Sequence, residues 1–162
     1  MDTIPELRAI LRDCHTLAVV GLSAEWHRPG FFAARYMPAH GYRIVPVSPR
    51  YAASGTDILG ERCCAEPAYI PFPVDMVDMF RRAEDVLPIA QEAVRIGARC
   101  LWLQLGVINH EAAGLANAAG LDVVMDRCVK IEYARLFGGL NYAGVNTRVI
   151  SAKRPPCPML PV

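Results

Sequence analysis

Short apolar runs alternate along the chain with segments in which apolar residues recur every three or four positions. The apolar runs lie at residues 16–21, 42–47, 74–80, 99–106 and 121–126. The segments with helical periodicity or composition lie at residues 4–13, 30–39, 84–96 and 109–119. A run that is apolar at nearly every position indicates a strand covered on both of its faces. The alternation predicts an α/β fold: a doubly wound, mainly parallel sheet with helices on both faces.

The segment between the second and third apolar runs is less regular. Residues 51–73 hold several prolines, and we expect a short edge strand near residues 62–64 and one helical turn near residues 66–70. After the last apolar run, residues 127–150 are expected to add a helix and a glycine-rich turn.

Domain limits follow from this pattern and from the C-terminal composition. Residues 1–150 are expected to form a single domain, and the proline-rich residues 151–162 a flexible tail. The apolar, glycine-rich segment 136–150 could pack on the domain, on a second copy of the chain or on another protein, and the sequence leaves these alternatives open.

Composition narrows the class of protein. The 162 residues are 53% apolar and 20% charged, which is typical of a globular domain. A net charge of +1 gives no general electrostatic attraction to nucleic acid or to a membrane surface, so no such partner is expected. The apolar runs are far shorter than the roughly 20 residues of a membrane-spanning helix, and no secretory signal is evident. We therefore expect a cytoplasmic protein with reduced cysteines and, for lack of CxxC pairs, no metal.

The first apolar run ends in a glycine turn. Ligands of doubly wound sheets bind beyond the carboxyl ends of the strands, and here Gly21, Leu22 and Ser23 follow the run. Glycine lets the backbone approach a phosphate closely, and the next helix offers free N–H groups. Arg28 could add a charge-assisted hydrogen bond. The pattern predicts a phosphate site, with an ordinary turn and solvated loop as the alternative.

The second apolar run ends in Val47, Ser48, Pro49 and Arg50. NAD-binding domains usually carry an Asp or Glu here, which accepts hydrogen bonds from the ribose. A hydroxyl and a cation instead suit a ribose that is itself phosphorylated, so NADP or coenzyme A (CoA) fits better than NAD. In the alternative interpretation Pro49 ends the strand and Arg50 is an ordinary surface residue.

The third and fourth runs end in further candidates. Phe80 could form an apolar wall of a ligand cleft, or it could belong to the core. Arg81 could point into the cleft, or it could point into solvent. An arginine in the first turn of a helix opposes the helix dipole, which favours a functional role. After the fourth run, Gln104 could supply an amide, and Gly106 suits a turn or a close backbone approach.

Catalytic residues are not evident. Cys128 stands at an expected helix start beside Arg127 and Lys130, where a thiol could have a lowered pKa, or it could simply be buried. The histidines are dispersed, and no nucleophile elbow, Walker loop or zinc-protease motif occurs. The sequence therefore nominates no catalytic residue, and we expect a protein that is not an enzyme.

Six stretches fall in order between residues 16 and 136: VVGLSAEWHRPGFFAARYM, HGYRIVPVSPR, ILGERC, PVDMVDMFRRAEDV, LWLQLGV and AAGLDVVMDRCVKIEYARL. Together they resemble the small, single-domain CoA-binding proteins related to the CoA-binding domain of the succinyl-CoA synthetase α subunit. The resemblance implies a Rossmann-like fold that binds CoA or an acyl-CoA through its ADP moiety. In many relatives the position of Ser48 looks like Asn, so this chain keeps a shorter hydrogen-bonding group there.

The resemblance also implies roles for individual positions. The residues along the pyrophosphate would be Gly21, Leu22, Ser23, Arg28 and Pro29. The residues around the adenosine and its ribose phosphate would be Val47, Ser48, Pro49 and Arg50. Phe80 and Arg81 would border the pantetheine path, and the far side of the cleft would be Gln104, Leu105 and Gly106.

A non-catalytic binding, sensor or carrier module is the leading interpretation. The larger synthetases need a second domain with a phosphorylated histidine and a separate nucleotide-binding subunit, and this chain has room for neither. One alternative is an NADP-dependent oxidoreductase, against which stand the missing third fingerprint glycine and the absence of a Tyr-x-x-x-Lys pattern. The other is thiol chemistry, in which Cys128 forms a mixed disulfide with CoA.

Overall fold

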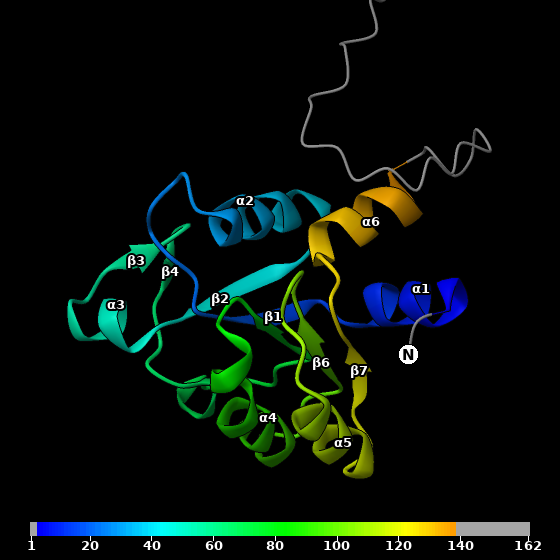
Figure 1. The fold of residues 1–162 in the computed structure, drawn as a ribbon. Coiled ribbons are helices and arrows are strands. Elements are labelled where there is room, and N and C mark those ends of the chain that lie inside the picture. The colour runs from blue at the N-terminus through cyan, green and yellow to red at the C-terminus, as the bar shows by residue number, and fades with distance from the viewer. Residues whose placement is uncertain (1–2, 139–162) are drawn as a thin grey trace, which may run out of the picture.

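The computed structural model describes residues 3–138 (Figure 1). The α-helices are α1 (Ile4–Asp13), α2 (Pro29–Tyr36), α3 (Pro49–Ala53), α4 (Val86–Arg95), α5 (His110–Ala118) and α6 (Val129–Phe137). Three 3₁₀ helices are η1 (Met37–His40), η2 (Pro67–Tyr69) and η3 (Ala83–Asp85). The strands are β1 (Thr16–Val20), β2 (Arg43–Val47), β3 (Asp57–Ile58), β4 (Glu61–Arg62), β5 (Met76–Met79), β6 (Cys100–Leu103) and β7 (Asp122–Val124).

A five-stranded parallel sheet forms the centre of the fold. Its strand order is β2-β1-β5-β6-β7, and every pairing is parallel. The chain runs outward from β1 to β2 and then returns to add β5 on the other side of β1. The loops after β1 and β5 therefore diverge to opposite sides, and such a switch point opens a crevice at the carboxyl ends of the strands. The predicted Rossmann-like α/β fold is confirmed.

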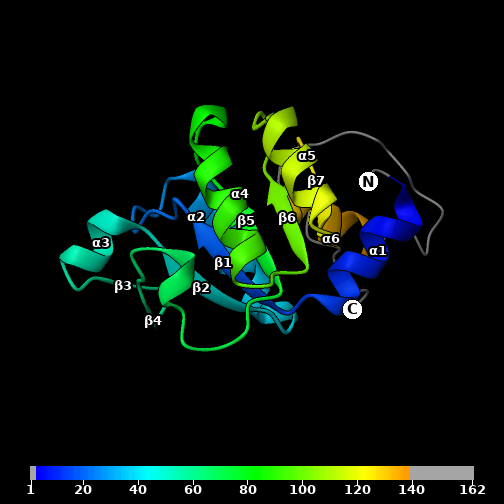
Figure 2. The same ribbon diagram turned by 90° about the horizontal axis from the view of Figure 1, so that it is seen from below.

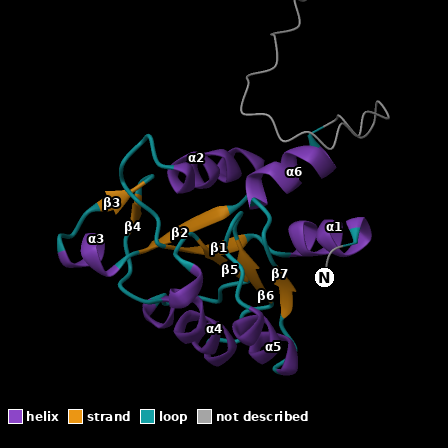
Figure 3. Ribbon diagram, in the orientation of Figure 1, coloured by secondary structure: helices purple, strands orange, loops and turns teal. Residues whose placement is uncertain are grey.

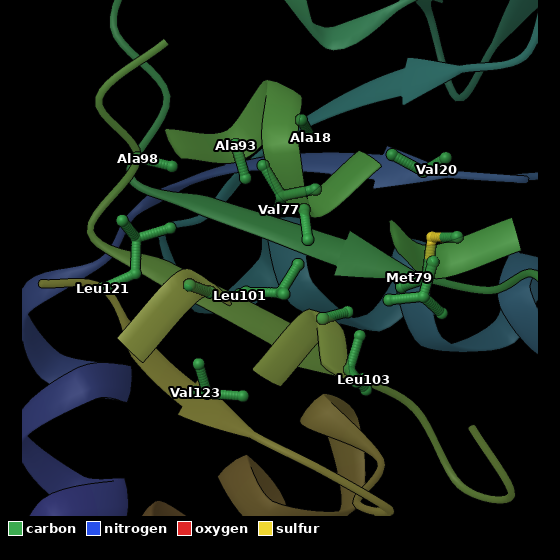
Figure 4. Close-up of a cluster of buried hydrophobic side chains, with 14 of the residues drawn as sticks. Ala18, Val20, Val77, Met79, Ala93, Ala98, Leu101, Leu103, Leu121 and Val123 are labelled. Atoms are coloured by element: carbon green, nitrogen blue, oxygen red, sulfur yellow. The ribbon is translucent and has the colours of Figure 1, made fainter. Parts of the chain in front are cut away.

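Helices cover both faces of this sheet, with α1, α2 and α6 on one face and α4 and α5 on the other (Figures 1 and 3). Successive strand residues alternate between the two cores. Val77, Met79 and Leu101 belong to the core under α4 and α5 (Figure 4), whereas Met76 and Trp102 belong to the core under α1, α2 and α6. Both cores exclude water, which explains why the strands are apolar at nearly every position.

Small side chains set the spacing of the layer formed by α4 and α5. Ala90 and Ala93 of α4 and Ala112 and Ala116 of α5 are completely buried, so the two helices lie close to the sheet and side by side (Figure 2). On the opposite face, the indole of Trp102 is fully buried and its Nε1 donates to the carbonyl of Arg127 at 2.7 Å. This bond ties β6 to the segment leading into α6.

The irregular region contains the predicted features and one additional helix. β3 and β4 form a two-stranded antiparallel hairpin, Cys64 bridges to Val47 at the edge of the main sheet, and η2 supplies the expected helical turn. The additional helix is α3, which was not predicted from the sequence. Pro49, which the alternative interpretation treated only as the end of the strand, occupies the first position of this helix, where its missing N–H is not needed.

The end of β6 differs from the prediction in an informative way. β6 ends at Leu103 rather than at residue 106, because Gly106 adopts a φ of +78° and donates its N–H to Asp126 Oδ1 at 2.7 Å. α6 confirms the helix expected after residue 127. The glycine-rich turn, the domain limit at residue 150 and the tail 151–162 lie outside the described residues.

Candidate functional site

A cavity of about 590 Å³ lies at the switch point, at the carboxyl ends of β1, β2 and β5. Its volume is within the range of small-molecule sites. Nine residues that the sequence predicted line it: Gly21, Leu22, Ser23, Arg28, Pro29, Ser48, Arg50, Phe80 and Arg81. Further lining residues that the prediction did not include are Glu25, Gly30, Tyr51, Arg82 and Asp85. The fold thus brings together three loops that are far apart in the sequence.

Gly21 is fixed by two constraints. Its φ is +84°, and its N–H donates to the carbonyl of Val47 at 2.8 Å, which extends the β1–β2 ladder by one bond. A Cβ atom at this position would lie 2.7 Å from Cγ of Arg81 and 3.0 Å from the carbonyl oxygen of Phe80. Because Cβ atoms essentially never show the first distance and the second is also tight, a side chain here would push apart the loops after β1 and β5 where they meet at the floor of the cavity.

Backbone donors line the β1 side of the cavity. Leu22 lines the cavity, and the residue as a whole is 1% exposed. Within residues 3–138, the N–H groups of Leu22, Ser23 and Gly30 donate to no acceptor. Gly30 follows Pro29 in the first turn of α2, at the positive end of the helix dipole. Free amides at a helix start are a common anion-binding arrangement.

A pair of hydroxyl groups closes the side between β1 and β2. Ser23 Oγ accepts a hydrogen bond from the N–H of Glu25 at 3.1 Å and lies 3.2 Å from the hydroxyl of Tyr51. Tyr51 belongs to α3, the helix that the sequence analysis did not predict, which is why this residue was missed. The contact joins the loop after β1 to the start of α3.

Four arginines, Arg28, Arg50, Arg81 and Arg82, reach the cavity from the three loops. Arg82 pairs with the exposed Glu84 at 3.1 Å. The guanidinium of Arg50 lies 5.4 Å from the centre of the Tyr51 ring. In the described part of the chain neither Arg50 nor Arg81 is ion-paired with a carboxylate. Since Glu25 and Asp85 are the acidic residues of the lining, the cavity is positively charged and suits a ligand with several phosphates.

Phe80 combines the two roles that the sequence left open. A Cβ on Gly30 would lie 3.2 Å from Cδ1 of Phe80, so the ring packs directly against the start of α2. The ring also packs on the core under α1, α2 and α6, and it lines the cavity. It provides an apolar wall beside the arginines.

The end of β6 is arranged differently from the prediction. The side chain of Gln104 is buried, and its Nε2 donates to Oδ1 of the buried Asp78 on β5 at 2.6 Å. Burial raises the pKa of Asp78 to about 7. The Gln104 amide is therefore engaged with Asp78, whereas the side chain of Leu105 is about half exposed. The predicted residues that do not line the cavity are Val47, Pro49, Gln104, Leu105 and Gly106.

Comparison with known proteins agrees with this geometry. Residues 15–134 match the family model described as the CoA binding domain. The chain belongs to this family. A protein of Bacillus subtilis, YneT, whose function is uncharacterized, is 33% identical over 129 residues, which are 80% of this chain and 93% of YneT.

Solved structures of similar proteins show the same fold. A hypothetical protein from Pyrococcus horikoshii is 32% identical with a TM-score of 0.80, over 85% of this chain and 94% of that chain. A Thermus thermophilus protein, cell-free ID.343, is 34% identical with a TM-score of 0.79, over 84% of this chain and 100% of that chain. This CoA binding domain therefore spans nearly the whole length of these relatives.

The surroundings of Cys128 raise the pKa of its thiol rather than lower it. This residue precedes α6, and burial raises the pKa of its thiol, with the nearby Asp78 acting in the same direction. The thiol hypothesis expected a lowered pKa, so the direction of the shift is the opposite of that expectation. Burial outweighs the neighbouring Lys130, which acts in the lowering direction.

Metal and membrane features are absent from the described part of the CoA binding domain. Residues 3–138 contain no group of three or more metal-ligating side chains. Over the same residues, no helix has the length and apolar character needed to cross a bilayer. The cysteines described there are free thiols.

Proposed function

We propose that this protein binds CoA or an acyl-CoA through the ADP moiety and acts in the cytoplasm as a non-catalytic binding, sensor or carrier module. One observation supports this most strongly. The cavity at the switch point collects free backbone amides from one loop and arginines without carboxylate partners from two others. A diphosphate attached to a phosphorylated ribose needs this combination of donors.

The pyrophosphate would lie at the β1 side of the cavity. The N–H groups of Leu22, Ser23 and Gly30 would donate to its oxygens, and Arg81 on the opposite loop would neutralise part of its charge. Gly21 has no Cβ, so Arg81 and the backbone of Phe80 can lie close to this part of the cavity. Pro29 is the first residue of α2, and its ring nitrogen carries no hydrogen, so it leaves no unpaired N–H at the helix start.

The adenosine and its ribose phosphate would lie at the β2 side. Arg50 would bind the ribose phosphate, and the hydroxyl of Ser48 would donate to the sugar or to the phosphate. The Tyr51 ring offers an apolar surface of suitable size for adenine. Val47 and Pro49 would shape the backbone here rather than contact the ligand with their side chains.

The pantetheine arm would leave the cavity over the ring of Phe80 and pass toward the end of β6. Leu105 is about half exposed there and offers an apolar contact. Gly106 would allow the arm to pass close to the backbone. Gln104 would contribute by holding the end of β6 in place through Asp78, since its side-chain amide is already bonded.

Two features of the site support binding without catalysis. Glu25, one of the acidic lining residues, is ion-paired with Arg28 and is thus a poor general base. Asp78, whose raised pKa would suit proton transfer, is buried to 1% exposure and does not line the cavity.

Calorimetric titration with CoA, dephospho-CoA and NADP tests this proposal. A charge-assisted hydrogen bond contributes about 1.5–3 kcal/mol, so dephospho-CoA should bind roughly 10- to 150-fold more weakly than CoA. Arg50→Ala should remove most of this difference. The control Arg95→Ala, at an exposed position on α4, should leave both affinities unchanged. Equal binding of CoA and dephospho-CoA by the unmodified protein, or tighter binding of NADP, would contradict the proposal.

A further inference from the structure

Glu25 places a negative charge inside a cavity that is otherwise suited to anions. Its Oε2 accepts a hydrogen bond from Nε of Arg28 at 3.0 Å and lies 3.5 Å from Nε2 of His27. Its backbone N–H is held by Ser23 Oγ at 3.1 Å. The carboxylate is therefore positioned by contacts within the loop that connects β1 to α2.

The surrounding charges show which groups the carboxylate faces. The hydrogen bond from Arg28 is the main cause that lowers the pKa of Glu25, and the electrostatic effects of His27 and Arg50 act in the same direction. Arg50 follows β2, so arginines on both sides of the cavity lower the pKa of the Glu25 carboxylate. A carboxylate of the protein thus pairs with one of the arginines that line the cavity in which a phosphate is proposed to bind.

We propose, on the basis of the CoA-binding function above, that Glu25 is an internal counter-anion that a ligand phosphate must displace from Arg28. In the free protein the carboxylate neutralises Arg28. In the complex a phosphate takes its place, and Glu25 turns toward solvent. Glu25 is then a specificity-determining residue, because it sets how much negative charge a ligand needs in order to bind.

The exposure of the pair makes this exchange feasible. The side chain of Arg28 is 60% exposed and that of Glu25 is 40% exposed, so the ion pair is weak enough for a ligand to break. The adjacent Trp26 is 71% exposed, so it does not hold the Glu25 side chain in place by burial. A carboxylate that stayed beside a bound diphosphate would repel it, which favours displacement over coexistence.

This arrangement separates ligands by charge. A phosphate with two negative charges gains more from Arg28 than the single charge of the carboxylate does, so a CoA-like ligand replaces Glu25. A neutral group such as the pantetheine arm or a nucleoside gains nothing comparable and leaves the ion pair intact. The amides of the β1 loop alone would not discriminate between ligands in this way.

Glu25→Gln tests the proposal, because it keeps the size and hydrogen-bonding capacity of the side chain and removes its charge. The affinity for CoA and for inorganic pyrophosphate should increase about two- to fivefold at low salt, which is the fold-change corresponding to an exposed ion pair. Asp85→Asn removes a second carboxylate of the lining, which has no ion pair with Arg28, and should give a clearly smaller increase. In an Arg28→Ala background, Glu25→Gln should give no increase beyond that of Asp85→Asn.

The outcomes distinguish this inference from the proposed function. Weaker binding in Glu25→Gln would mean that Glu25 contacts the ligand directly, and gains equal to those of Asp85→Asn would mean a general charge effect; either result overturns the inference. If the unmodified protein binds neither CoA nor pyrophosphate, the proposed function fails. In that case binding of pyrophosphate by Glu25→Gln would still support the counter-anion, and no binding by either protein would overturn both.

Discussion

Replacing Gly21 with alanine perturbs the point where the loops after β1 and β5 meet. Two penalties act on the folded protein. A residue with a Cβ in the left-handed region loses about 1–2 kcal/mol, and the φ of Gly21 is +84°. The new Cβ would also lie 2.7 Å from Cγ of Arg81 and 3.0 Å from the backbone oxygen of Phe80. Because a backbone atom cannot move aside cheaply, overpacking adds about 1–3 kcal/mol.

Gly41 provides a matched control for this variant. Its φ is +87°, and no atom lies within 4 Å of a Cβ built on it, so Gly41→Ala carries the conformational penalty without the clash. The entropy that alanine removes from the unfolded chain is the same in both variants and cancels in the comparison. Gly21→Ala should therefore lower the free energy of unfolding by about 1–3 kcal/mol more than Gly41→Ala does.

Urea unfolding of both variants measures this difference, with unchanged m-values as the check on two-state behaviour. Calorimetric titration with CoA adds a functional measurement, since displacement of Arg81 and Phe80 should weaken binding in Gly21→Ala and leave Gly41→Ala unaffected. Equal losses of stability in the two variants, together with equal affinities, would refute the close contact of the two loops.

Two further predictions concern buried ionisable groups. Burial raises the pKa of Asp78 to about 7, against about 3.9 in an unfolded chain. The folded state therefore binds more protons between these pH values, so the free energy of unfolding should fall between pH 4 and pH 7 by as much as roughly 4 kcal/mol. Urea unfolding at several pH values should show that Asp78→Asn lacks most of this fall. A pH profile identical to that of the unmodified protein would argue against a raised pKa of Asp78. Since burial raises the pKa of Cys128, iodoacetamide at pH 7.5 should modify this thiol more slowly than it modifies free cysteine. Mass spectrometry that shows preferential labelling of Cys128 would contradict this prediction and support the thiol hypothesis.

The sequence predicted the class of fold because each buried strand carries its own signal. Val77 and Trp102 belong to runs that are apolar on both sides, and this requires a sheet covered on two faces. The order of the strands has no such local signal, because the alternation of strands and helices is the same for any order. The position of the switch point between β1 and β5 became evident only in the structure.

The site shows the same division between local and long-range information. Gly21 and Arg50 were predicted from their places after strands, which is a local property. The hydroxyl contact between Ser23 and Tyr51 and the bond between Asp78 and Gln104 join residues from different loops and strands. Asp78 did leave a signal, a carboxylate within the apolar run 74–80, but its partner could be identified only once β5 and β6 were placed side by side.

A crystal structure of the protein grown with excess CoA is the most direct test of the account. We expect the diphosphate beside the amides of Leu22, Ser23 and Gly30 and facing Arg81, with the ribose phosphate against Arg50. Side chains of the protein filling this cavity, or CoA bound elsewhere on the surface, would contradict the central claim that the switch point between β1 and β5 is the nucleotide site.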